Sequence, residues 1–94
     1  MHEEHLLQDL VARVDELARA EGGAPVVRVR FWVGALSHLT AATLRSKWPL
    51  AARGTLGEDA VVLVEASTDL DDPRAQSVVL TSFDVKDRSS PAER

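Results

Sequence analysis

The sequence of 94 residues contains no cysteine. Disulfide bonds, cysteine nucleophiles and thiolate-bound zinc are therefore excluded. It also contains no block of lysine or arginine, and its formal net charge is −4, so nucleic-acid binding has no electrostatic basis. No apolar run is long enough to span a membrane, and no basic segment followed by an apolar one opens the chain. These absences predict a cytoplasmic protein that binds neither nucleic acid nor membrane.

Patterns that identify enzymes are also missing. No serine has the setting of a nucleophile, no glycine-rich phosphate loop is present, and the acidic residues are scattered over expected helix surfaces and turns. We therefore expect a protein without catalytic activity. The length predicts a single domain over residues 1–86, followed by a flexible, polar C-terminal tail over residues 87–94.

Two segments have the periodicity of helices. Apolar residues recur at helical spacing over residues 3–21, and a pair of glycines ends the pattern. A second helix is expected over residues 40–53, with Thr40 or an earlier serine as its N-cap. Pro49 lies inside this segment, so a kink or break is expected near residues 47–48.

Three segments have the character of strands: residues 26–33, 60–66 and 78–85. The second is apolar on both faces, which is typical of a well-buried strand. The first two strands enclose the second helix in a right-handed crossover, so they should be parallel, and a short turn suits an antiparallel third strand. The sequence therefore predicts an α/β (α+β) fold, a mixed three-stranded sheet with two helices on one face, in the order α-β-α-β-β.

Alternation along the first strand separates a core face from an open face. The residues predicted to face the core are Val27, Val29, Phe31 and Val33. The opposite face carries Val26, Arg28, Arg30 and Trp32, and is either open or covered by another chain. It is a contact surface or, more simply, a solvated sheet face on which arginine stems cover the indole.

The first residues, Met1-His2-Glu3, bring metal-binding groups together. With histidine at position 2, the α-amine, a backbone amide nitrogen and imidazole Nδ1 close adjoining five- and six-membered chelate rings. Three nitrogens in one plane suit Ni(II) or Cu(II). The alternative is that His2 is simply an exposed residue at a frayed terminus. His5 is a candidate fourth ligand or a solvated histidine, and His38 is expected to be exposed.

Three aspartates between residues 68 and 73 form an acidic cluster. Carboxylates at this density can bind a hard cation such as Ca²⁺. However, no glycine-centred loop or later bidentate glutamate accompanies them, so turn chemistry explains them better.

Three stretches together resemble the HypA/HybF family of hydrogenase nickel-insertion proteins. Met1-His2-Glu3 opens an amphipathic helix. Residues 29–37, VRFWVGALS, look like the family's V-x-V-G-x-L-S strand exit, and residues 53–60, RGTLGEDA, are similar to its R-G-T-x-x-E-G-A segment. With the order of elements, the resemblance covers residues 1–85.

This resemblance implies a nickel-binding metallochaperone for maturation of nickel-iron hydrogenase, with Ni(II) bound transiently at the N-terminus. The matching ligands are the Met1 amine and the His2 imidazole, with backbone nitrogen from the first residues and Glu3 beside them. Met1 is expected to be retained, because a bulky second residue blocks its removal. The implied partners are the hydrogenase large subunit and a maturation GTPase, and a homodimer is a further candidate.

The chain departs from the family between the second and third strands. There the family carries a zinc module with two C-x-x-C pairs, whereas residues 68–76 form a short turn here and no cysteine is present. Structural zinc is therefore not expected. Two functions remain open: a nickel chaperone without zinc, or a diverged, metal-free interaction module that dimerises through the exposed face or edge of the sheet.

Overall fold

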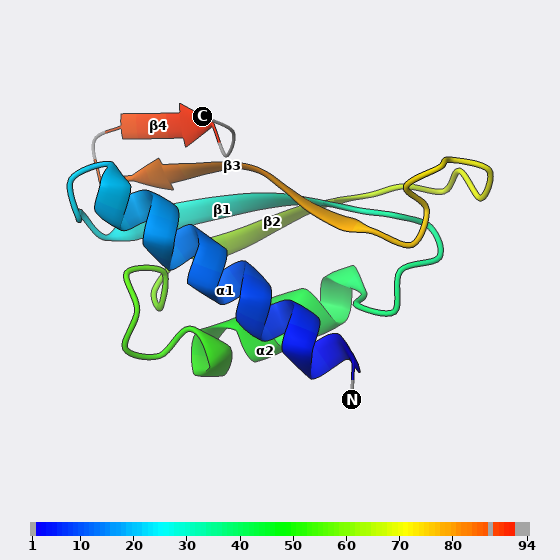
Figure 1. Ribbon diagram of the computed structural model, residues 1–94, viewed down its shortest axis with the longest axis horizontal. Helices are drawn as coiled ribbons and strands as arrows, with labels where there is room; N and C mark the ends of the chain where they lie inside the picture. The colour runs from blue at the N-terminus through cyan, green and yellow to red at the C-terminus, as the bar shows by residue number, and fades with distance from the viewer. Residues whose placement is uncertain (1, 87, 92–94) are drawn as a thin grey trace.

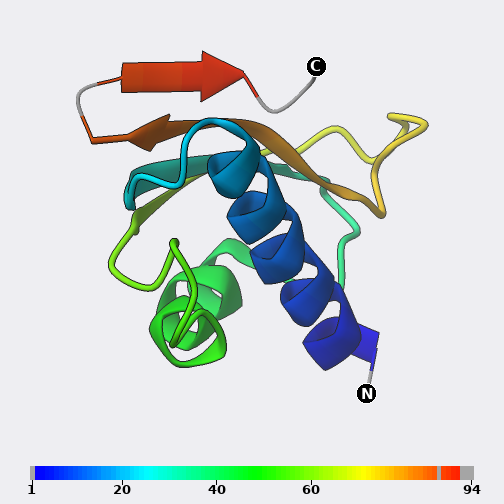
Figure 2. The same cartoon turned by 60° about the vertical axis from the view of Figure 1, so that its left-hand side comes forward.

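Two helices lie on one face of a four-stranded sheet in the described part of the computed structural model (Figures 1 and 2). The structure describes residues 2–86 and 88–91, with the backbone alone described for residues 2–4 and 88–91. In chain order the elements are α1 (His2–Ala20), β1 (Val26–Val33), α2 (Ala41–Ala51), β2 (Val61–Ala66), β3 (Val78–Val85) and β4 (Arg88–Pro91). The predicted fold class and the order α-β-α-β-β are confirmed. β4 is an additional short strand, formed by residues that the sequence assigns to the tail.

The strands lie in the order β2-β1-β3-β4, with β1 inside the sheet. β1 and β2 are parallel in one unbroken register, as the crossover through α2 predicts. β3 runs antiparallel and pairs with the other side of β1, and β4 then pairs antiparallel with β3. The loop of residues 67–77 therefore passes from one side of β1 to the other, and β2 remains at the edge.

Two irregularities in the β1–β3 pairing change which side chains face the core. At the first, Val27 is an extra residue between Val26 and Arg28, so Val26 is buried and Val27 is 40% exposed. The predicted facing of these two valines is therefore wrong. At the second, Thr81 is the extra residue on β3, and its hydroxyl donates to the carbonyl oxygen of Arg30 at 3.0 Å. Simple alternation cannot reveal such bulges.

α2 begins and ends close to its predicted bounds. The Thr40 hydroxyl accepts a hydrogen bond from the Thr43 amide at 3.2 Å, which is the expected N-cap geometry. The sequence predicts a kink or a break near residues 47–48. The helix runs on through Pro49 to Ala51, so the break is absent. Only Leu50 and Ala51 follow Pro49 in the helix, and the proline removes a single backbone hydrogen bond there.

The core lies between the helices and the sheet. Trp48 of α2 is fully buried, and its ring lies 5.6 Å from that of Phe31 between centroids, at 58°. α1 contributes the apolar stripe that its sequence predicts. The buried hydrophobic residues of α1 are Leu7, Leu10, Val11, Val14, Leu17 and Ala18.

β2 is not the well-buried strand that its apolar sequence predicts. Val62 and Val64 pack against the core, but Val61 and Leu63 are 56% and 42% exposed. The reason is the position of β2 at the sheet edge with both helices on one face. Neither described helix is long and apolar enough to cross a membrane.

Candidate functional site

The predicted metal-binding groups belong to the first three residues of the sequence. Met1 and the side chains of His2 and Glu3 lie outside the described residues, but α1 begins at His2. The first four N–H groups of a helix have no partner within the helix. The amide nitrogen of His2 is therefore not needed for the hydrogen bonds of α1, and its use as a metal ligand breaks none of them.

α1 holds this end of the chain close to the core. Leu7 is 4% exposed and lies five residues after His2, about 7.5 Å along the helix axis. Further along, Val14 is fully buried. The backbone of the candidate site is therefore carried by a helix that is fixed to the fold within two turns.

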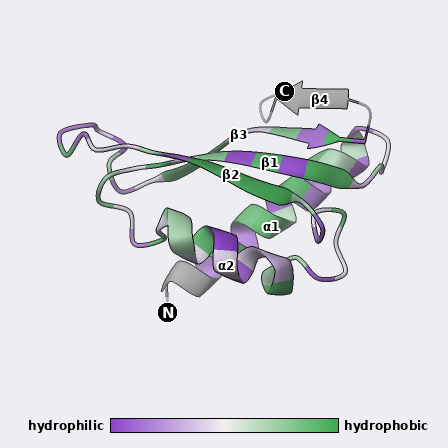
Figure 3. Ribbon diagram, turned by 180° about the vertical axis from the view of Figure 1, so that it is seen from behind, coloured by the Kyte–Doolittle hydropathy of each residue, from purple (hydrophilic) through white to green (hydrophobic). Residues whose placement is uncertain are grey.

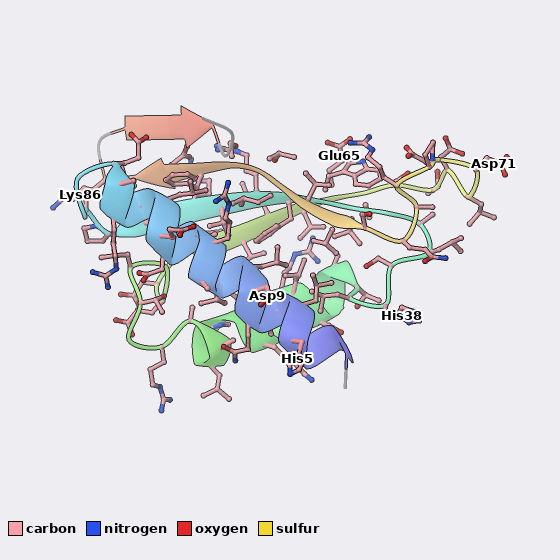
Figure 4. The ribbon with its side chains drawn as sticks, viewed as in Figure 1. His5, Asp9, His38, Glu65, Asp71 and Lys86 are labelled. Atoms are coloured by element: carbon pink, nitrogen blue, oxygen red, sulfur yellow. The ribbon has the colours of Figure 1, made fainter. Side chains whose placement is uncertain are left out.

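His5 and His38 are both exposed but lie apart. Figure 4 shows His5 near the start of α1 and His38 on the loop that leaves β1. His5 lines an open groove of about 480 Å³ between the helices, together with Leu7, Gln8, Lys47, Leu50 and Ala51. Among the described residues, no group of three or more His, Cys, Asp or Glu side chains is arranged to hold a metal. Of the two histidines, only His5 belongs to α1, the helix that begins at His2.

The aspartates of residues 68–73 cap turns. Asp69 Oδ1 accepts from the Asp71 amide at 3.0 Å, and Asp72 Oδ1 accepts from the Arg74 amide at 2.7 Å. Asp71 lies at the tip of the β2–β3 loop (Figure 4), far from the start of α1. These bonds confirm the interpretation as turn chemistry.

The segment of residues 53–60 is a loop held by its own hydrogen bonds. Gly54 adopts φ +83°, a conformation that glycine adopts without a steric penalty. The Thr55 hydroxyl donates to the Ala52 carbonyl at 2.7 Å and accepts from the Gly57 amide at 3.2 Å. Glu58 Oε1 accepts from the Gly54 amide at 3.3 Å. These contacts explain the glycine, threonine and glutamate of this stretch by local structure.

The same loop joins both helices. Trp48 Nε1 donates to the Gly57 carbonyl at 2.8 Å in the core, and the Leu56 amide donates to Asp15 Oδ1 at 2.9 Å. Two hydrogen bonds lower the pKa of Asp15 below its ordinary value. The larger effect comes from the Leu56 amide and the smaller from Arg19, at 2.9 Å. The pair of Asp15 with Arg19 has the i, i+4 spacing of neighbours on one helix face, whereas no local pattern links Asp15 with Leu56.

The strand exit of residues 29–37 is fixed by the β2–β3 loop. The Gly34 amide donates to the Ser77 carbonyl at 2.8 Å, and the Leu36 amide donates to the Ala75 carbonyl at 2.7 Å. A Cβ on Gly34 would lie 2.2 Å from the Ala75 carbonyl oxygen, so no larger residue fits. The glycine of this stretch is therefore required by close backbone contact.

The open face of the sheet carries an internal ion cluster. Asp84 is 5% exposed, and its carboxylate accepts from Arg28 Nη1 at 2.7 Å and from both Nη atoms of Arg30 at 3.0 Å. This hydrogen-bonded carboxylate raises the pKa of Arg30 above its ordinary value. Arg74 lies over the Trp32 ring, 4.6 Å from its centroid. The arginines are thus paired on the sheet itself, by a partner that the sequence analysis missed.

Comparison with known proteins agrees with these segments. A family model described as "Hydrogenase/urease nickel incorporation, metallochaperone, hypA" matches residues 1–69. Proteins named hydrogenase maturation factor HypA are similar over 64–65 residues: 38% identity in Chlorobium limicola, 36% in Rhodobacter capsulatus and 35% in Chlorobaculum tepidum.

These alignments cover 68–69% of this chain and 56–58% of each relative. The chain thus spans just over half the length of the curated relatives that it matches. The family match takes in the N-terminal motif, the strand exit and the loop of residues 53–60, and it stops within the loop between β2 and β3. The chain belongs to the HypA family.

Proposed function

We propose that this chain is a metallochaperone that holds Ni(II) at its N-terminus and delivers it during maturation of nickel-iron hydrogenase. The observation that carries the proposal is the family match, which starts at Met1 and includes the whole of α1. The relatives are named as hydrogenase maturation factors, and the family description names nickel incorporation. The hydrogenase large subunit and a maturation GTPase are the proposed partners.

The proposed ligands are the Met1 α-amine, the His2 amide nitrogen and the His2 imidazole Nδ1, with Glu3 beside them. The two chelate rings share the amide nitrogen, so the three nitrogens favour a planar site and leave one position for a further ligand. His5 is the candidate for that position, because it lies one turn further along the same helix. An open position also suits transfer, because a client ligand can enter there before the chaperone releases the metal.

We propose that this site works without structural zinc. The chain has no cysteine, and residues 67–77 connect β2 and β3 directly. The fold at this point depends on backbone hydrogen bonds from the loop to the end of β1. These hydrogen bonds hold the loop of residues 67–77 in place without a metal.

Calorimetric titration with Ni²⁺ near neutral pH tests the site. Three proteins are compared: the chain starting at Met1, its His2→Ala variant, and the chain extended by one N-terminal glycine. We expect one Ni²⁺ per chain at micromolar affinity or tighter for the first protein alone, since the other two lose a chelate ring. His38→Ala is the matched control for the loss of one exposed imidazole, because this histidine lies on the loop after β1 and not on α1.

Other results would change the proposal in defined ways. Equal nickel binding by all three proteins would place the site elsewhere, and His5→Ala would then be the next variant. Absence of binding in all of them would overturn the proposal and leave a HypA fold without its metal.

Acid should release the metal. The α-amine and imidazole lose protons to bind, and their unperturbed pKa values are about 7.7–8.0 and 6.5. We therefore expect the affinity for Ni²⁺ to fall steeply below about pH 6.5. Retention of nickel with unchanged affinity at about pH 5 would contradict nitrogen ligands of this kind.

A further inference from the structure

The two edges of the sheet differ in how they are protected. β4 has four residues, begins with Arg88 and ends with Pro91. Short length, charge and proline are features by which natural sheets prevent an edge from pairing with another chain. β2 has six residues, and Glu65 is its single charged residue. It contains no proline, glycine or lysine, and its pairing with β1 has no bulge.

The outer side of β2 is open. Among the described residues, β2 makes its backbone hydrogen bonds to β1 alone, so its outward N–H and C=O groups face away from the sheet without a protein partner. Beside them, Val61 and Leu63 are 56% and 42% exposed. Figure 3 shows β2 at the border of the sheet and coloured as hydrophobic along most of its length. Another β-strand satisfies such a row of donors and acceptors.

We propose that β2 pairs with the β2 of a second copy of this chain, antiparallel about a two-fold axis at Leu63. In this register Leu63 faces Leu63, Val61 faces Glu65, and Val62 faces Val64. Apolar side chains then lie opposite one another on the core face and at the centre of the open face. A two-fold axis closes the contact at two copies, and the two sheets become one continuous sheet.

The charges fit the antiparallel orientation. The antiparallel pair separates the two Glu65 carboxylates by four residues, roughly 14 Å, so they do not repel each other at close range. Because Arg28 pairs with Val61 across the sheet, the Glu65 of the second copy falls in line with Val61 and Arg28. At that end of the open face, Arg28 and Arg30 share the single carboxylate of Asp84, so an additional carboxylate is attracted.

Single-cysteine variants test the register directly, because the chain has no cysteine of its own. We expect Leu63→Cys to form a disulfide-linked dimer under mild oxidation. Val61→Cys alone should not cross-link, but a mixture of Val61→Cys with Glu65→Cys should. Cross-linking of Val61→Cys with itself, or absence of cross-links in both Leu63→Cys and the mixture, would overturn the proposed pairing.

The oligomeric state supplies a second test. Light scattering from micromolar to millimolar protein should show a concentration-dependent dimer for the wild type and a monomer for Leu63→Lys, which places a charge at the two-fold axis. Leu50→Lys is the matched control, since Leu50 is 69% exposed on α2 and should leave the dimer intact. A wild type that stays monomeric throughout, or a Leu50→Lys variant that dissociates as Leu63→Lys does, would overturn the proposal.

Two further measurements distinguish pairing through β2 from contact through other surfaces: the effect of salt on the dimer and the oligomeric state of His2→Ala. Each copy has a net charge of −4, so salt should strengthen an apolar pairing by screening the repulsion. Complete dissociation by salt would contradict a pairing held mainly by apolar contact, to which the attraction between Glu65 and Arg28 only adds. His2→Ala should dimerise like the wild type, because the inference does not depend on nickel. Loss of the dimer in that variant would overturn this independence, whatever the outcome of the nickel titration.

Discussion

Two kinds of segment carry the likeness of this chain to the HypA family. The strand exit of residues 29–37 and the loop of residues 53–60 are explained by contacts that the fold needs, above all the approach of Gly34 to Ala75 and the bond from Leu56 to Asp15. The N-terminal motif instead starts a helix that is anchored further along, from Leu7 onwards. Likeness in the first two segments therefore reports the fold, and the proposed binding of nickel rests on the third.

We call residues 29–37 and 53–60 the fold-bearing segments. The variant expected to affect them most is Gly34→Ala. Its Cβ would meet backbone atoms of residue 75 at 2.2 Å, so the β2–β3 loop must move. We expect a loss of roughly 3 kcal/mol or more in the free energy of unfolding, measured by urea denaturation. Gly57→Ala is the control, because its nearest contact is a side-chain atom of Trp48 at 3.3 Å and the cost should be smaller. Equal stability of the wild type and Gly34→Ala would refute the packing argument.

Trp48→Phe should have the next largest effect. The variant keeps an aromatic ring in the core but loses the hydrogen bond from Trp48 Nε1 to the Gly57 carbonyl, which then keeps only the bond from the Ala60 amide at 3.1 Å. The expected cost is roughly 0.5–1.5 kcal/mol from the lost hydrogen bond, with a further loss from the smaller ring. Trp32→Phe on the open face is the control and should cost less than about 1 kcal/mol. Thermal unfolding followed by circular dichroism would compare the two variants.

Asp15→Asn should reduce stability less, and in a way that depends on pH. The folded-state pKa of Asp15 lies below its unfolded value of about 3.9, because the Leu56 amide and Arg19 favour the carboxylate. This contribution is fully present above pH 3.9 and is lost as the pH falls through the lower folded-state pKa. Asparagine keeps an acceptor for Leu56, so we expect a loss of about 1 kcal/mol at neutral pH.

The pH profile decides whether this assignment is right. The difference in unfolding free energy between wild type and Asp15→Asn should shrink as the pH falls below about 4. A constant difference down to about pH 2 would show that the Asp15 charge is not responsible. Asp9→Asn, measured at neutral pH, controls for the removal of one negative charge from α1, where Asp9 is exposed.

Among these variants, His2→Ala should have the smallest effect on stability and the largest effect on the affinity for Ni²⁺. We expect a change below about 0.5 kcal/mol in the metal-free protein, together with loss of Ni²⁺ binding. Urea denaturation without metal, run beside the nickel titration, gives both quantities. Destabilisation comparable to that of Trp48→Phe would remove the distinction between the N-terminal motif and the fold-bearing segments.

The sequence is sufficient for features that depend on local pattern. The helical stripe of α1, the capping threonine of α2 and the crossover between β1 and β2 all follow from spacing and chain connectivity. The exposure of Leu63 does not, because an apolar strand has the same sequence at the centre or at the edge of a sheet. The exposure of Val27 could not be predicted either. The bulge at this residue depends on how β1 pairs with β3, which the sequence of β1 alone does not reveal.

The candidate site is divided in the same way. The N-terminal chelate is predicted from three consecutive residues, whereas the contacts of Asp15 and Asp84 depend on residues 41 and 56 positions away. A charged residue inside an apolar strand was the one available signal for Asp84. Its partners, Arg28 and Arg30, were recognised, but pairing between strands could not be assigned from sequence alone.

The loop between β2 and β3 is anchored in a way that tolerates a change in its length. The Ser67 amide donates to the Val33 carbonyl at the end of β1. The amide of Gly34, which follows Val33, donates to the Ser77 carbonyl. Both distances are 2.8 Å. The two ends of the loop are thus held on either side of one strand, roughly 10 Å apart. Closing a longer segment across this span costs only about 0.6 kcal/mol for each doubling of its length. A longer connection at this junction would therefore cost little free energy while the pairing of the sheet stays the same.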